Sequence, residues 1–213
     1  MYNAIKHSIL HQNVTFSPTS GFHHATPNGG RGFCSFSGQV IASIKILKEF
    51  GIAGAYIDLD GHFGNSIEDS KYYIPNLDQA IRANINPSGR HENYINNFKN
   101  QFEKVMELIR NNEIGYIVLC SGADSLIDDD LGGQLTIKEW MSIKDYLHSR
   151  LAEFDKSNSK FPTTISLFGG YRSDEYTSVL DAHTLDLISC LKHRFGMEAE
   201  YESVYKYNMS FIK

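Results

Sequence analysis

The sequence predicts an α/β protein in which helices cover both faces of a mainly parallel sheet, forming three layers in a single domain over residues 1–213. First, strand-like and helix-like segments alternate along the chain, as in parallel-sheet proteins. Second, the segments 54–59 and 115–120 are mainly apolar, as strands buried on both faces are. Third, four predicted strands each end in a glycine-containing turn with a His, Asp or Tyr. Sites in open parallel sheets form at the carboxyl ends of strands, so this recurrence predicts a site there.

The individual elements follow from residue spacing and capping signals. The predicted strands cover residues 14–16, 54–59, 115–120 and 164–168, and the predicted helices cover 37–50, 93–111, 136–154 and 178–195. Gly51 ends the first of these helices, and Thr136 with Glu139 three residues later predicts a capping box for the third. The stretch 66–90 contains Pro and Gly and has no regular pattern, so no element is predicted there.

Composition argues against several functional classes. The net charge is −5, and no basic patch with interleaved aromatic residues indicates nucleic-acid binding. No apolar run approaches the ~20 residues of a membrane-spanning helix, and no signal peptide is visible. The three cysteines are an odd set without paired spacing, which favours free thiols in a reducing compartment. We therefore expect a cytoplasmic protein that binds neither nucleic acid nor a membrane.

The segment 56–65 is the most informative part of the chain. Asp58, Asp60 and His62 alternate at period two after an apolar run. If the run is a strand, these three side chains leave it from one face. Two carboxylates and an imidazole at one place are typical of a metal site. A buried strand followed by a polar turn is the alternative interpretation.

Three other clusters accompany this segment. His23 and His24 are adjacent in a loop after the first predicted strand, Asp124 follows the third strand, and Tyr171 follows Gly-Gly after the fourth. The acidic run 128–130 is more simply read as a solvated loop than as a cation site.

In chain order, these clusters resemble motifs of one known group, the zinc-dependent histone deacetylase superfamily with the arginase/deacetylase fold. The matching blocks are Gly21-Phe22-His23-His24-Ala25, Gly32-Phe33-Cys34-Ser35-Phe36, Asp58-Leu59-Asp60-Gly61-His62-Phe63-Gly64-Asn65, Gly122-Ala123-Asp124 with Asp129 and Leu131-Gly132, and Gly169-Gly170-Tyr171. Catalytic domains of this superfamily are roughly half again as long and carry further elements before the histidine pair. We therefore expect a short member, or a fragment truncated at the amino terminus, and we expect homo-oligomers because lost strands would expose a sheet edge.

The resemblance implies a metal centre. Asp60, His62 and Asp124 would bind one Zn²⁺, although ligand types alone also allow Fe²⁺ or Co²⁺. Asp58 and backbone carbonyls near Asp60 and His62 would hold a structural monovalent cation such as K⁺.

The resemblance also implies catalytic roles. His24 would be the general base, and His23 would stabilise the transition state electrostatically. Asp58 would fix the tautomer of His23, and Asn65 would partner His24 without the charge that some relatives supply there. Tyr171 would donate a hydrogen bond to the oxyanion.

The substrate tunnel is where the sequence departs from the family. Gly32 and Phe33 match one wall, which contacts the aliphatic stem of an acyl-lysine. The opposite wall has a plausible counterpart only in the segment 72–75. We therefore expect a shallower and wider pocket than the family tunnel.

Together these features predict a metal-dependent amidohydrolase, a deacetylase or deacylase that hydrolyses the C–N bond of a linear acyl-amide such as acyl-lysine. Alternatives are a deacylase of acetylpolyamines or small molecules, and a degenerate relative that binds metal without catalysis. An arginase-like ureohydrolase would need additional Asp and His ligands for a second metal, which the sequence does not show.

Overall fold

The computed structural model describes residues 1–19, 22–198, 201 and 203–204. The helices are α1 (Tyr2–His11), α2 (Gly38–Phe50), α3 (Ser66–Lys71), α4 (His91–Arg110), α5 (Ile137–Ala152) and α6 (Thr177–Phe195), with short 3-10 helices η1 (Leu77–Gln79) and η2 (Ala123–Ser125). The strands are β1 (Val14–Ser17), β2 (Gly54–Asp58), β3 (Ile81–Ile85), β4 (Tyr116–Gly122) and β5 (Thr163–Phe168).

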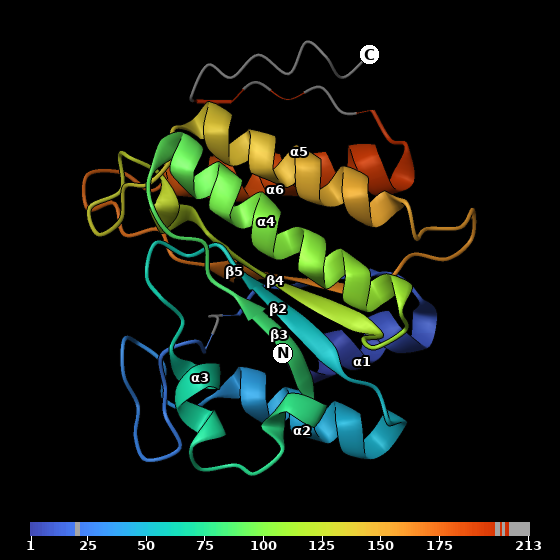
Figure 1. The fold of residues 1–213 in the computed structure, drawn as a ribbon. Coiled ribbons are helices and arrows are strands. Elements are labelled where there is room, and N and C mark those ends of the chain that lie inside the picture. Colours follow the sequence, from blue (N-terminus) through green and yellow to red (C-terminus); the bar gives the residue numbers. More distant parts are fainter. Residues whose placement is uncertain (20–21, 199–200, 202, 205–213) are drawn as a thin grey trace.

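The five strands form one all-parallel sheet in the order β1-β5-β4-β2-β3. Helices α4, α5 and α6 lie on one side of this sheet, and α1, α2 and α3 lie on the other (Figure 1). The predicted α/β class and the parallel sheet between helices are therefore confirmed. None of the helices in the described part of the chain is long and apolar enough to cross a lipid bilayer.

The predicted irregularity of residues 66–90 is wrong in part, because this stretch contains α3, η1 and the edge strand β3. The burial pattern explains the omission. Only Ile81 and Ile85, the two ends of β3, are buried, while Arg82 between them is exposed. Such an edge strand lacks the continuous apolar signal of β2 and β4.

Two cores form because side chains alternate across the sheet. From β2, Ala55 and Ile57 pack with α4, α5 and α6, whereas Tyr56 packs with α1 and α2. Neighbouring β4 repeats the pattern, with Ile117 on the first side and Val118 on the second. This two-sided burial holds β2 and β4 rigidly in the middle of the sheet.

The predicted helix signals are observed. The Ser37 side chain caps α2, and Gly51 ends that helix in the left-handed conformation with φ 68°. The capping box of Thr136 and Glu139 begins α5 with both reciprocal hydrogen bonds.

Candidate metal and catalytic centre

The loops that follow the neighbouring strands β2 and β4 bring three potential metal ligands together. One ligand atom from each of Asp60, His62 and Asp124 lies within 4.8 Å of the others. His62 Nδ1 is 2.8 Å from Asp124 Oδ2 and 3.2 Å from Asp60 Oδ1. Both carboxylates are buried, while the His62 side chain is 39% exposed. The cluster is thus closed by the sheet on one side and accessible through His62.

The predicted single-strand arrangement of Asp58, Asp60 and His62 is not what the structure shows. Strand β2 ends at Asp58, and the chain then turns so that the His62 backbone N–H donates to Asp60 Oδ1 at 2.9 Å. Asp58 instead accepts a hydrogen bond from His23. Only Asp60 and His62 therefore join Asp124 in the cluster.

The electrostatics of the cluster fit a bound cation. Burial, together with the nearby charge of Asp60, raises the pKa of Asp124 to about 8. The hydrogen bond to Asp60 raises the pKa of His62 to about 9. Asp60 Oδ2 is buried and has no hydrogen-bond partner among the described residues. The charged carboxylates of Asp60 and Asp124 repel each other, because their ligand atoms lie within 4.8 Å. A divalent ion would neutralise both and bind the unpaired oxygen.

Glycines without side chains leave room for the Asp60 and Asp124 carboxylates. A Cβ added at Gly169 would lie 2.2 Å from Asp124 Oδ1, and one added at Gly122 would lie 2.6 Å from the same atom. Neither distance is compatible with a side chain unless the carboxylate moves. The two glycines at the ends of β4 and β5 therefore let the Asp60 and Asp124 carboxylates occupy this position.

The histidine pair lies beside this cluster. His23 Nδ1 is 2.8 Å from Asp58 Oδ2, and His23 Nε2 is 3.8 Å from Asp60 Oδ1. Burial opposes charging of His23, but the charge and hydrogen bond of Asp58 outweigh it and raise its pKa. His24 Nδ1 is 3.0 Å from Asn65 Oδ1, and burial lowers the pKa of His24. The structure thus brings both predicted histidine–partner pairs together.

Tyr171 and Phe33 form an aromatic pair next to the cluster. Their ring centroids are 5.8 Å apart with an interplanar angle of 30°, and the Tyr171 ring meets the His62 ring edge-on at 6.3 Å. Burial raises the pKa of Tyr171, so the hydroxyl keeps its proton at neutral pH. Gly32 adopts a φ of +50°, and a Cβ there would be 2.4 Å from the His24 ring.

Three further side chains bind backbone groups of the loops around the cluster, and the sequence did not predict these contacts. Asn86 Oδ1 accepts from the Gly64 backbone N–H at 2.7 Å, and Gln134 Nε2 donates to the Gly61 carbonyl at 2.9 Å. Asp129 accepts from the Tyr171 backbone N–H at 2.7 Å. Asp129 carried a motif signal, whereas Asn86 follows the strand that was missed and Gln134 has no distinguishing signal.

The acidic run is more than the solvated loop that the sequence predicted. Asp128 pairs with the Arg172 guanidinium at 2.7 Å, and Asp130 accepts from the Ser173 backbone N–H at 2.8 Å. Asp128 and Asp130 are both exposed, as expected. Their side chains nevertheless bind residues of the loop that follows β5.

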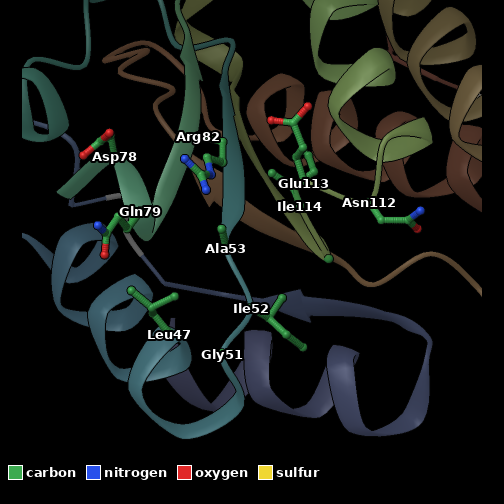
Figure 2. Close-up of a pocket in the computed structure, with 11 residues that line it drawn as sticks. Leu47, Gly51, Ile52, Ala53, Asp78, Gln79, Arg82, Asn112, Glu113 and Ile114 are labelled. Atoms are coloured by element: carbon green, nitrogen blue, oxygen red, sulfur yellow. The ribbon is translucent and has the colours of Figure 1, made fainter. Parts of the chain in front are cut away.

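Two cavities differ in their relation to this centre. One of about 520 Å³ is lined by His24, Gly32, His62, Phe63 and neighbouring polar residues, so it reaches His62 of the cluster and the proposed general base His24. Another of about 830 Å³ lies at the amino-terminal ends of β2, β3 and β4, far along the sheet from the cluster. Figure 2 shows its polar lining, which includes the side chains labelled Asp78, Arg82 and Glu113. This second cavity holds none of the predicted site residues.

Comparison with known proteins gives a consistent result. Residues 2–80 match the histone deacetylase domain family. The chain is 26% identical over 237 residues to "Probable histone deacetylase 1-A" of Xenopus laevis. This alignment covers 96% of this chain and 45% of the Xenopus protein. It is 26% identical over 233 residues to "Histone deacetylase 1" of Homo sapiens, with the same two coverages. It is 28% identical over 197 residues to "Histone deacetylase B" of Dictyostelium discoideum, covering 79% of this chain and 44% of that protein.

An all-parallel sheet with an Asp/His/Asp cluster at its carboxyl edge defines an α/β protein with a candidate metal centre. The chain is similar in sequence to the histone deacetylase domain family over residues 2–80, and to histone deacetylases of other organisms at 26–28% identity. It spans about 45% of the length of the first curated relatives that it matches.

Proposed function

We propose that this protein is a metal-dependent deacylase that hydrolyses the amide bond of an acylated amine. The observation that carries the proposal is the meeting of an Asp/His/Asp cluster, a histidine pair and Tyr171 at one edge of the sheet. A purely structural metal would need neither the histidine pair nor the tyrosine. The match of residues 2–80 to the histone deacetylase domain family supports the same reaction class.

Asp60, His62 and Asp124 would hold the ion, and Zn²⁺ is our first choice because its sites combine carboxylate and imidazole ligands. When bound, such an ion lowers the pKa of water and polarises a substrate carbonyl. Fe²⁺ and Co²⁺ accept the same ligands. Asp58, with the backbone carbonyls around it, would also hold a monovalent cation such as K⁺.

The two histidines would divide the proton transfer. His24 has a lowered pKa, so its imidazole is neutral at neutral pH and can accept a proton as general base. His23 has a raised pKa because of Asp58, which favours the charged form and suits electrostatic stabilisation of developing negative charge. The different hydrogen-bond partners, a carboxylate and an amide, support this division of roles.

Tyr171 would donate its hydroxyl proton in a hydrogen bond to the oxyanion that forms from the substrate carbonyl. Gly32 and Phe33 would contact the stem of the acylated amine, and the exposed Phe33 ring is available for that contact at 84% exposure. Acyl-lysine in a protein and small acyl-amines such as acetylpolyamines both fit this chemistry.

The test is a fluorogenic acyl-lysine assay combined with metal analysis of the purified protein. We expect about one equivalent of metal per chain, activity that a chelator removes, and recovery on adding Zn²⁺. Chelator-resistant amide hydrolysis would contradict the metal-dependent reaction. A protein that holds metal but is inactive on acyl-lysine and acetylpolyamine substrates would favour a non-catalytic relative.

A further inference from the structure

The carboxylate of Asp129 connects two segments of the candidate centre. Its Oδ2 accepts from the Tyr171 backbone N–H at 2.7 Å, and its Oδ1 accepts from the Leu131 backbone N–H at 2.9 Å. Both oxygens are therefore committed to backbone donors, one in its own loop and one in the loop after β5. We propose that Asp129 is a positioning residue that sets where Tyr171 stands relative to the metal cluster. This inference rests on the proposed function.

The Asp129 loop is itself fixed to a predicted metal ligand. The Asp129 backbone N–H donates to the Leu126 carbonyl at 3.1 Å, and the Gly133 N–H donates to the Asp124 carbonyl at 3.2 Å. A Cβ placed on Gly132 would lie 1.4 Å from the Asp124 carbonyl oxygen, so the loop packs directly on the Asp124 backbone. Through Asp129, the position of Tyr171 is tied to that of Asp124.

The loop that carries Tyr171 needs such an external contact. It leaves β5 through Gly169 and Gly170, whose φ angles are +55° and +97°. These two glycines restrict the backbone little, because they lack the Cβ that limits the φ angles of other residues. Asp128 and Asp130 hold Arg172 and Ser173 further along, at the exposed side of the loop. Asp129 is the member of the run that contacts Tyr171 itself.

The consequence for the reaction is specific. An oxyanion donor works only when it lies at hydrogen-bond distance from the place where the charge develops. Asp129→Asn preserves size, but its amide presents an NH₂ group to one of the two backbone donors. We expect the Tyr171 loop to shift, and kcat to fall by about 10- to 100-fold, the range over which ~1 Å misplacements act. Substrate KM and metal content should stay near those of the parent protein.

A double-mutant cycle tests whether Asp129 acts through Tyr171. The four proteins are the parent, Asp129→Asn, Tyr171→Phe and the double variant, with Asp130→Asn as the matched control on the same acidic run. We expect the double variant to be no slower than Tyr171→Phe, because the hydroxyl that Asp129 places is already gone. We expect Asp130→Asn to change kcat less than threefold. Multiplicative losses in the double variant would overturn the proposal.

Hydrogen exchange provides a readout that does not depend on turnover. Asp129→Asn should increase amide exchange in a peptide covering 169–175 at least several-fold, whereas exchange in β4 should not change. Unchanged exchange at 169–175 would overturn the proposal even if kcat falls. If the parent protein has no activity, the proposed function fails, and the exchange experiment alone decides the positioning role.

Discussion

At the scale of single residues, partners rather than residue types set the chemistry of this centre. His23 and His24 are adjacent, yet one has a raised pKa and the other a lowered pKa. The difference follows from a buried carboxylate, Asp58, beside the first and a neutral amide, Asn65, beside the second. Identical side chains can therefore take the charged and the neutral role at one site.

Removing a proposed ligand should remove the metal. His62→Ala and Asp124→Ala each leave two of three protein ligands, too few for a stable site. Metal analysis of the purified variants should fall from about one equivalent per chain to a small fraction. His7→Ala is the matched control, because His7 is exposed on α1, which contributes no residue to the cluster. Near-stoichiometric metal in either ligand variant would refute the assignment.

Tyr171→Phe should separate catalysis from binding. The substitution removes only the hydroxyl and preserves the ring that stacks on Phe33. We expect kcat to fall by about 10²- to 10³-fold, the usual cost of one oxyanion donor, with metal content and thermal stability unchanged. An unaltered kcat would show that Tyr171 merely packs against its neighbours.

At the scale of elements, the strand ends decide which residues can form the centre. Gly169 and Gly51 both have positive φ, at +55° and +68°. A Cβ on Gly169 would strike Asp124 Oδ1, whereas one on Gly51 would meet nothing within 4 Å. Ala at either position pays the backbone strain of a left-handed residue, roughly 1–2 kcal/mol. Only Gly169→Ala also displaces a metal-cluster carboxylate.

This pair of glycines separates strain from site damage. In urea without metal, we expect Gly51→Ala to lower the free energy of unfolding by the backbone strain alone, and Gly169→Ala to lower it further because its Cβ strikes a buried carboxylate. Metal titration should show a large loss of affinity for Gly169→Ala and none for Gly51→Ala. Equal metal affinity in the two variants would mean that the Gly169 contact with Asp124 does not matter.

The helices and strands also show which parts of the fold can be predicted from the sequence. The helices α2, α4, α5 and α6 were predicted to within a few residues because each repeats apolar positions at helical spacing. Strands β2 and β4 were visible as continuous buried runs. Strand β3 was missed because its burial comes from pairing with β2 and packing on α4. Neither contact leaves a pattern in the local sequence. Long-range pairing, unlike periodicity, is absent from a short window of sequence.

The candidate site divides in the same way. The histidine pair, the Asp/His/Asp cluster and Tyr171 were predicted from motifs, and the structure places them side by side. The contacts from Asn86 and Gln134 to the metal loop were not predicted. They join segments that lie more than twenty residues from the loop in sequence, so only the folded chain reveals them.

At the scale of the whole molecule, a second buried polar group lies between α5, α6 and β4, away from the centre. Lys144 Nζ is 3.2 Å from Asp186 Oδ2 and 2.9 Å from Ser121 Oγ, and His148 Nε2 is 3.0 Å from Asp186 Oδ1. His183, on the same helix as Asp186, has a buried Nδ1 with no hydrogen-bond partner among the described residues. Burial lowers the pKa of His148 and lowers that of His183 to about 4.

These histidines predict a loss of stability in mild acid. A folded-state pKa below the unfolded value of about 6.5 means that the unfolded chain binds the proton more readily. The resulting stability is present above pH 6.5 and is lost as the pH falls toward 4. For His183 the difference corresponds to roughly 2–3 kcal/mol after allowance for its partial exposure. Urea unfolding at pH 7.5, 6.5, 5.5 and 4.5 measures this slope.

His183→Gln isolates the contribution of His183 from that of other acid-sensitive groups. Glutamine does not titrate, so the variant should lose less unfolding free energy than the parent between pH 6.5 and 4.5, whatever its stability at pH 7.5. His7→Gln, at an exposed position on α1, is the control for the effect of exchanging histidine for glutamine on a helix. Parallel pH profiles for the parent and His183→Gln would show that His183 is as easily protonated in the folded protein as in the unfolded chain.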